Sequence, residues 1–168
     1  MAPPPARLTS RMRDALEQVI LDAVPQLRQL CRDPWQLIGS AAARLAGADV
    51  SVADLDLLTS AADAARLTDA WRDRLEASYE PAGAERFRSH FARFRFPGMP
   101  VEVMGALELN AGQGWQPVAV HETVQVRVAG LDVPVPSIPE QIRILESFAR
   151  PKDLHRAALL RALPGTAS

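Results

Sequence analysis

The stretch from Trp35 to Ser60, WQLIGSAAARLAGADVSVADLDLLTS, constrains the fold more than any other part of the chain. Its pattern indicates a short apolar strand ending at Gly39, an alanine-rich helix, and a second strand that carries two aspartates. Gly39 has no Cβ and lets the backbone turn tightly, and Ser40 is expected to cap the helix and leave free N–H groups facing outward. This turn predicts an anion site that a phosphate group would fit.

The second strand of this stretch carries Asp54 and Asp56. Because side chains alternate along a strand, the two aspartates share one face, while Leu55 and Leu57 point to the other and can enter the core. Adjacent carboxylates on one face repel each other, and a hard divalent cation such as Mg²⁺ offsets that cost most readily. The pair therefore predicts a metal site.

A third carboxylate, Glu102, stands among apolar neighbours in a predicted strand at 101–109. That strand is expected to form a hairpin with residues 87–96 across the turn Pro97 to Pro100. If it lies beside the aspartate strand, Glu102 completes a cluster of three carboxylates; otherwise Glu102 is a surface residue. Arginines and phenylalanines alternate irregularly from 86 to 96, which favours a core hairpin over contact with RNA or a nucleotide.

The remaining segments predict one α/β domain at 9–163, between an extended leader at 1–8 and a tail at 164–168. The N-terminal helical segment, 9–31, is expected to kink or break near Val24, because Pro25 removes a hydrogen-bond donor. Ser137 to Glu140 reads as a capping box that opens a helix. Periodicity also predicts helices at 63–79 and 152–163, and short strands at 118–120, 124–128 and 131–135.

Composition bounds the class of protein without selecting a partner. A chain of 168 residues with 48% hydrophobic and 23% charged residues is typical of one globular domain. A formal net charge of −1 gives no global attraction to nucleic acid or to an anionic membrane. The single cysteine, Cys31, and the lack of a long apolar run favour a cytoplasmic protein with no membrane contact.

Several enzyme classes have no support in the sequence. It contains no GxSxG elbow for a serine nucleophile, no GxxxxGK[ST] phosphate loop and no dinucleotide fingerprint. His90, His121 and His155 are scattered without the spacing of zinc ligands.

Gly39-Ser40 followed by Asp54-x-Asp56 resembles the signature of the nucleotidyltransferase superfamily, especially its minimal, AbiEii-like members. The segment Pro100 to Gly105 resembles the later strand that carries the third carboxylate of the family. Residues 130–137 and 150–154, the latter with the sequence RPKDL, resemble its closing hairpin and helix. The resemblance covers about 35 to 160 and implies an α/β (α+β), polymerase-beta-like fold with a mixed central sheet flanked by helices.

The resemblance also implies an activity and its residues. It implies Mg²⁺-dependent transfer of a nucleoside monophosphate, AMP by family habit, from ATP or another nucleoside triphosphate to an acceptor hydroxyl. Asp54, Asp56 and Glu102 would hold one or two Mg²⁺ ions, with Glu102 alternatively taking the proton of the acceptor. Gly39 and Ser40 would cradle the β and γ phosphates, and Arg150 and Lys152 either reach the triphosphate or pair with an acid such as Asp153.

The acceptor stays open between a small antibiotic, a tRNA end and a protein hydroxyl. Because few residues follow the RPKD segment, we expect the acceptor to bind on the N-terminal helix, in a homodimer cleft or on a partner protein. A second class of function also stays open: a catalytically weak interaction module, such as the antitoxin partner of a toxin.

Overall fold

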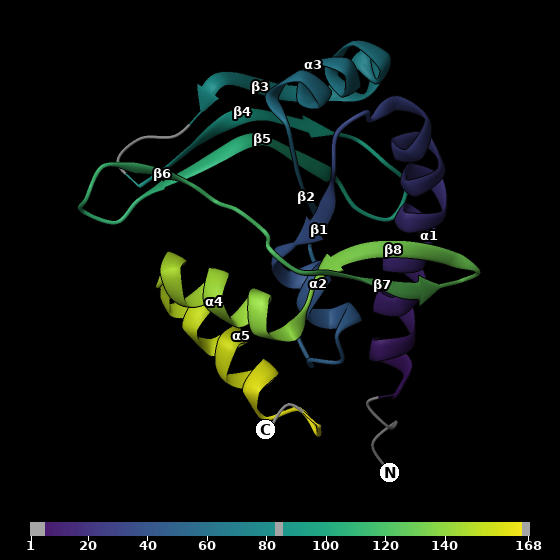
Figure 1. Ribbon diagram of the computed structural model, residues 1–168. Helices are drawn as coiled ribbons and strands as arrows, with labels where there is room; N and C mark the ends of the chain where they lie inside the picture. The colour runs from purple at the N-terminus through teal and green to yellow at the C-terminus, as the bar shows by residue number, and fades with distance from the viewer. Residues whose placement is uncertain (1–5, 83–85, 166–168) are drawn as a thin grey trace.

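The computed structural model describes the backbone of residues 6–82 and 86–165, and the side chains of 15–78 and 86–165 (Figure 1). A central sheet has the strand order β1-β2-β5-β4-β3, with β6 pairing with β5. Its strands are β1 (Gln36–Ile38), β2 (Leu55–Thr59), β3 (Leu75–Ala82), β4 (Phe87–Phe94), β5 (Val101–Asn110) and β6 (Trp115–Pro117). The strands β7 (Thr123–Val128) and β8 (Leu131–Pro136) form a separate antiparallel hairpin.

The central sheet is mixed, as the family resemblance implied. β2 runs parallel to β5, whereas β1 pairs antiparallel with β2 and β4 pairs antiparallel with β5. The parallel pairing of β2 and β5 requires a crossover, and α3 (Ala61–Ala70), β3 and β4 lie within that connection. The crossover brings Asp56 directly opposite Glu102 in the register.

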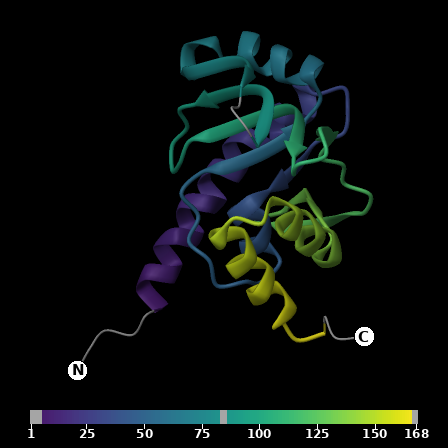
Figure 2. The same cartoon turned by 90° about the vertical axis from the view of Figure 1, so that its left-hand side faces the viewer.

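Helices cover both faces of the sheet (Figures 1 and 2). On one face α1 (Ala6–Leu30) and α3 pack against a core that includes Leu55, Leu57 and Phe94. On the other face α4 (Ile138–Phe148) contributes Ile144 and Phe148 to a second cluster with Leu58 and Leu107. α5 (Pro151–Arg161) packs against α4 and also contacts α2 (Gly39–Leu45). Asp56 and Glu102 point toward the side of α4 and α5, because they alternate with the buried Leu55, Leu57, Val101 and Val103.

Side-chain caps fix where two helices begin. Ser60 accepts a hydrogen bond from the backbone N–H of Asp63 at the start of α3, and Ser137 accepts one from Glu140 at the start of α4. The serine cap of the predicted capping box at Ser137 is therefore confirmed. The reciprocal half is absent, because the backbone N–H of Ser137 donates to the carbonyl of Glu122 and the Glu140 carboxylate accepts from the N–H of His121. α4 ends at Phe148, and Ala149 caps it with a left-handed φ of 59°.

The predicted helix at 63–79 is wrong in its second half. α3 ends at Ala70, a 3-10 turn (η1, Arg72–Arg74) follows, and β3 begins at Leu75. Trp71 closes the helix and packs edge-on against Phe94, at 5.2 Å between ring centroids, and against Phe96, at 4.9 Å. Leu67, Trp71 and Leu75 keep a helical spacing, but pairing with β4 decided the structure of the later residues, because strand preference depends on tertiary context.

Three smaller expectations also differ from the structure. α1 continues through Pro25 to Leu30, so a break near Val24 is wrong as a prediction, while a kink stays a prediction. The fully buried Val24 and Leu27 hold both sides of the proline against the core. The helix begins at Ala6, within the predicted leader. Residues 1–5 of that leader and residues 166–168 of the predicted tail lie outside the described residues. Residues 118–120 form no strand, and the short strand here is β6, which pairs with the end of β5.

Within the described ranges, no helix is both long and apolar enough to cross a lipid bilayer.

Candidate active site

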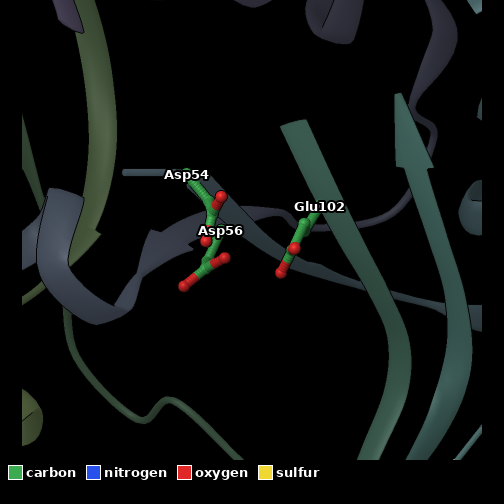
Figure 3. Close-up of side chains that lie close together, drawn as sticks. All are labelled: Asp54, Asp56 and Glu102. Carbon is green, nitrogen blue, oxygen red and sulfur yellow. The ribbon is translucent and has the colours of Figure 1, made fainter. Parts of the chain in front are cut away.

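Asp54, Asp56 and Glu102 converge at the edge where β2 and β5 begin (Figure 3). One carboxylate oxygen from each residue lies within 4.8 Å of the others. Asp54 immediately precedes β2, Asp56 lies within it, and Glu102 points toward them from the neighbouring strand (Figure 3). The expected adjacency of the two strands is confirmed, and Glu102 is not an isolated surface residue.

Asp56 is the most deeply placed carboxylate of the three. Burial raises its pKa to about 7, the negative charges of Glu102 and Asp54 add to this shift, and Arg156 opposes it. Its Oδ1 atom is inaccessible to solvent and has no hydrogen-bond partner within the described part of the chain. Three oxygen donors and a buried carboxylate oxygen without a partner fit a hard divalent cation, which uses such ligands.

Gly39 forms the wall beside Asp56. It has a φ of 68°, and a Cβ built on it would lie 2.7 Å from Oδ2 of Asp56. A side chain here would therefore meet the carboxylate itself. The predicted tight turn at Gly39 is confirmed, and its close neighbour is the Asp56 carboxylate.

Ser40 lies in the first turn of α2 and does not cap it. The residue at the cap is Ile38, which has no side-chain cap hydrogen bond. The predicted serine cap is wrong because the turn is completed one residue earlier, by the positive φ of Gly39. Ser40 is instead buried against the cleft that contains the carboxylates.

A cleft of about 510 Å³ contains all seven residues that the sequence assigned to the site. Its lining comes from three places: Asp54, Asp56 and Glu102 at the starts of β2 and β5, Gly39 and Ser40 at the start of α2, and Arg150 and Lys152 at the N-terminus of α5. Further along, its walls are apolar and aromatic, formed by Phe87, Phe91, Met104, Leu107, Leu145 and Phe148. One cleft thus joins a carboxylate cluster, a group of cationic side chains and an apolar surface.

The two cations predicted from the RPKD segment have different surroundings. Arg150 binds Asp153 through two nitrogens, Nε at 2.6 Å and a terminal nitrogen at 3.1 Å, so the pairing considered from sequence is present. Its guanidinium also lies 5.0 Å from the centre of the Phe87 ring. Lys152 is exposed at the cleft.

Two arginines of the site were missed by sequence reasoning. Arg156 lines the cleft one helical turn after Lys152, and this i, i+4 spacing could have identified it. Arg93 lies opposite Glu102 in the register of β4 and β5 and bonds to it. The irregular alternation of arginines and phenylalanines predicted a hairpin but not the register that brings Arg93 to Glu102.

Comparison with solved structures gives the chain the nucleotidyltransferase fold. A nucleotidyltransferase candidate from Thermotoga maritima, TM1012, superposes with a TM-score of 0.65 at 22% identity, over 93% of this chain and 89% of that one. The lincosamide antibiotic adenylyltransferase LnuA, in its lincomycin-bound form, gives 0.56 at 13% identity, over 84% of this chain and 94% of that one. The antibiotic-resistance factor ANT(2'')-Ia gives a TM-score of 0.51 at 13% identity, over 92% of this chain and 83% of that one.

No protein-family model and no curated protein sequence matched the chain.

Proposed function

We propose that the protein is a Mg²⁺-dependent nucleotidyltransferase that moves a nucleoside monophosphate, AMP in the first instance, from a nucleoside triphosphate to an acceptor hydroxyl. One observation carries the proposal: three carboxylates from two neighbouring parallel strands converge in a cleft, and the buried Oδ1 of Asp56 lacks a hydrogen-bond partner among the described residues. The order of Gly39-Ser40, Asp54-x-Asp56, Glu102 and RPKD supports an AbiEii-like member of the superfamily.

Asp54, Asp56 and Glu102 would hold one or two metal ions. When bound, such ions neutralise a triphosphate and act as Lewis acids on the phosphorus that is attacked. The side chains fit this task because each offers an oxygen donor at the same point of the cleft.

The triphosphate would lie between the turn at Gly39-Ser40 and the cationic side of α5. The missing Cβ of Gly39 leaves room for the Asp56 carboxylate beside this turn, so the phosphates would meet the backbone of the turn and the metal ligand together. Lys152 and Arg156 supply positive charge from one face of α5. Arg150 supplies more, although Asp153 already neutralises part of it.

A small hydroxyl compound is the acceptor that the cleft favours. The aromatic and aliphatic wall beyond Glu102 offers contacts to an uncharged body more than to a polyanion. LnuA, which acts on a lincosamide antibiotic, is matched over 94% of its chain, so a fold of this extent suffices for that enzyme. A tRNA end and a protein hydroxyl are the competing acceptors. A cytoplasmic location, favoured by the single cysteine Cys31, belongs to the same proposal.

Calorimetric titration of ATP with Mg²⁺ tests the proposal directly. Wild-type protein is expected to bind ATP only when Mg²⁺ is present, and the double variant Asp54→Asn/Asp56→Asn is expected to lose that binding. A folded wild-type protein that binds none of the four common nucleoside triphosphates with Mg²⁺ would sink the proposal. The interaction-module alternative, including a toxin partner or a homodimer, would then be favoured.

A further inference from the structure

Arg93 places a permanent positive charge within the carboxylate cluster. One of its terminal nitrogens bonds to Glu102 and also lies 3.4 Å from Oδ1 of Asp54. Arginine stays charged in proteins at all ordinary pH values. Two of the three candidate metal ligands are therefore in contact with a cation that belongs to the chain itself.

Glu76 on β3 holds this charge in position from the opposite side. Its carboxylate accepts a hydrogen bond from Nε of Arg93 at 3.0 Å. The guanidinium is thus bound by β3 through Glu76, by β5 through Glu102 and by the start of β2 through Asp54. A planar group with three such partners on three segments has little freedom to leave the cluster.

This charge acts differently on a bare divalent ion and on an ion bound to a triphosphate. A bare ion is doubly positive and is repelled by Arg93 at short range. A complex of a divalent ion with a nucleoside triphosphate carries net negative charge, so Arg93 attracts it or leaves it unaffected. The same side chain should therefore weaken one binding event and support the other.

We propose that Arg93 suppresses binding of bare divalent ions to the Asp54/Asp56/Glu102 cluster, so that the metal enters the site as its complex with the nucleotide. The proposal rests on the nucleotidyltransferase function proposed above. In this proposal Arg93 determines that the metal ion does not bind before the nucleotide, which the carboxylates alone do not determine. Its signature is that removal of the charge tightens binding of the bare ion and does not tighten binding of the metal–nucleotide complex.

The test measures two affinities in wild-type protein and in Arg93→Met. Bare Mn²⁺ is titrated with the protein and the free ion is followed by electron paramagnetic resonance. The Mn²⁺ complex of a non-hydrolysable ATP analogue is titrated by calorimetry. Arg93→Met is expected to bind bare Mn²⁺ about tenfold more tightly than wild type, as the removal of one like charge at this range predicts. The same variant is expected to bind the metal–nucleotide complex no more tightly than wild type.

Three further variants separate charge from structure. Arg93→Lys keeps the charge and should leave bare Mn²⁺ affinity near that of wild type. Arg93→Gln removes the charge while keeping hydrogen-bond donors, so it should also bind bare Mn²⁺ more tightly than wild type. It takes the place of Arg93→Met in the test if the methionine variant does not fold. Arg95→Met removes an exposed arginine that follows β4 and contacts the backbone carbonyl of Asp73, and it should change neither affinity.

A folded Arg93→Met or Arg93→Gln variant that binds bare Mn²⁺ no more tightly than wild type overturns the inference. Weaker binding of both ligands would have the same meaning, because loss of a merely structural contact predicts it. Failure of the proposed function is recognised separately: wild-type protein would then not bind the metal–nucleotide complex, whereas the comparison of bare Mn²⁺ affinities would still decide the role of Arg93.

Discussion

Gly39 lies so close to Asp56 that a Cβ at position 39 would be 2.7 Å from Oδ2 of the aspartate. Gly39 also has a φ of 68°, which L side chains rarely adopt. The turn between β1 and α2 and the carboxylate on β2 therefore constrain each other. Any side chain at position 39 must displace either the turn or the candidate metal ligand.

Gly39→Ala is expected to disturb both stability and the site. The backbone conformation costs about 1 kcal/mol, and displacement of the Asp56 carboxylate should weaken Mg²⁺-dependent ATP binding by about tenfold or more. Urea unfolding and calorimetry measure the two effects. Gly114→Ala is the matched control, because Gly114 has a φ of 86° but no atom within 4 Å of a built Cβ. It should lose a similar amount of stability and keep ATP binding; equal binding losses in both variants would refute the steric explanation.

Asp56→Asn is expected to raise the free energy of unfolding of the metal-free protein above that of wild type, by an amount that grows as the pH rises. Folding raises the pKa of Asp56 to about 7, so the folded protein binds this proton more tightly than the unfolded chain does. The stabilising contribution is complete below the unfolded pKa of about 4 and is lost as pH rises through 7. Asparagine does not ionise, and the stability of the variant relative to wild type should rise by roughly 4 kcal/mol between pH 4 and pH 8, at about 1.4 kcal/mol for each unit of the pKa shift.

Unfolding in urea with EDTA at several pH values between 4 and 8 measures this gain. Asp69→Asn is the control, because Asp69 is an exposed residue paired with Arg72. Stability differences between Asp56→Asn and wild type that stay constant over the whole pH range would contradict the buried position of this carboxylate.

Asp63→Ala is expected to destabilise the fold without touching the site. Asp63 is fully buried in α3 and accepts hydrogen bonds from the backbone N–H groups of Arg32 and Asp33. Burial alone would raise its pKa, but these hydrogen bonds, together with those from Arg66 and Thr59, lower it. The variant should lose about 3 kcal/mol near neutral pH, because buried donors are left without an acceptor.

The pH dependence of this loss has the opposite sign to that of Asp56. A lowered pKa gives stability that is present above the unfolded pKa and is lost as the pH falls through the folded value. The difference in the free energy of unfolding between wild type and Asp63→Ala should therefore become smaller below about pH 4. Asp49→Ala, which removes an exposed partner of Arg44, should cost less than about 1 kcal/mol. ATP binding should survive in Asp63→Ala under conditions where it is folded, since α3 packs on the face of the sheet opposite the cleft.

The sequence predicted the segments of the site whose chemistry is local. Gly39 was identified because a tight turn requires glycine, and the aspartates because alternation along a strand puts them on one face. Ser137 was recognised as a cap from its spacing to Glu140, three residues on. Each of these inferences depends on neighbours within a few positions of the chain.

What the sequence did not predict depends on long-range pairing. Residues 75–78 became a strand because β4 was available to pair with them, although their spacing suited a helix. Arg93 contacts Glu102 only through the register of β4 and β5, in which Phe94 pairs with Val101 and Arg93 with Glu102. Such a register cannot be counted from the turn at 97–100 alone, since one residue of slip reverses the faces.

Lys152→Ala and Arg156→Ala are expected to affect nucleotide binding in distinguishable ways. Both side chains line the cleft on the same face of α5, so each variant should weaken Mg²⁺-dependent ATP binding by about tenfold at pH 8 and low salt. Arg156 additionally lowers the pKa of Asp56. Its removal should leave that carboxyl protonated to higher pH, and ATP binding should then require a more alkaline solution.

Calorimetry of ATP with Mg²⁺ between pH 6 and pH 9 separates the two roles. In Arg156→Ala the midpoint of the binding curve should move upward from that of wild type, whereas in Lys152→Ala the affinity should fall at every pH with an unchanged midpoint. Arg161→Ala, at the other end of α5 and paired with Glu146, removes an equal charge and should alter neither affinity nor midpoint. A midpoint that is the same in wild type and Arg156→Ala would mean that Arg156 acts on the phosphates alone and not through Asp56.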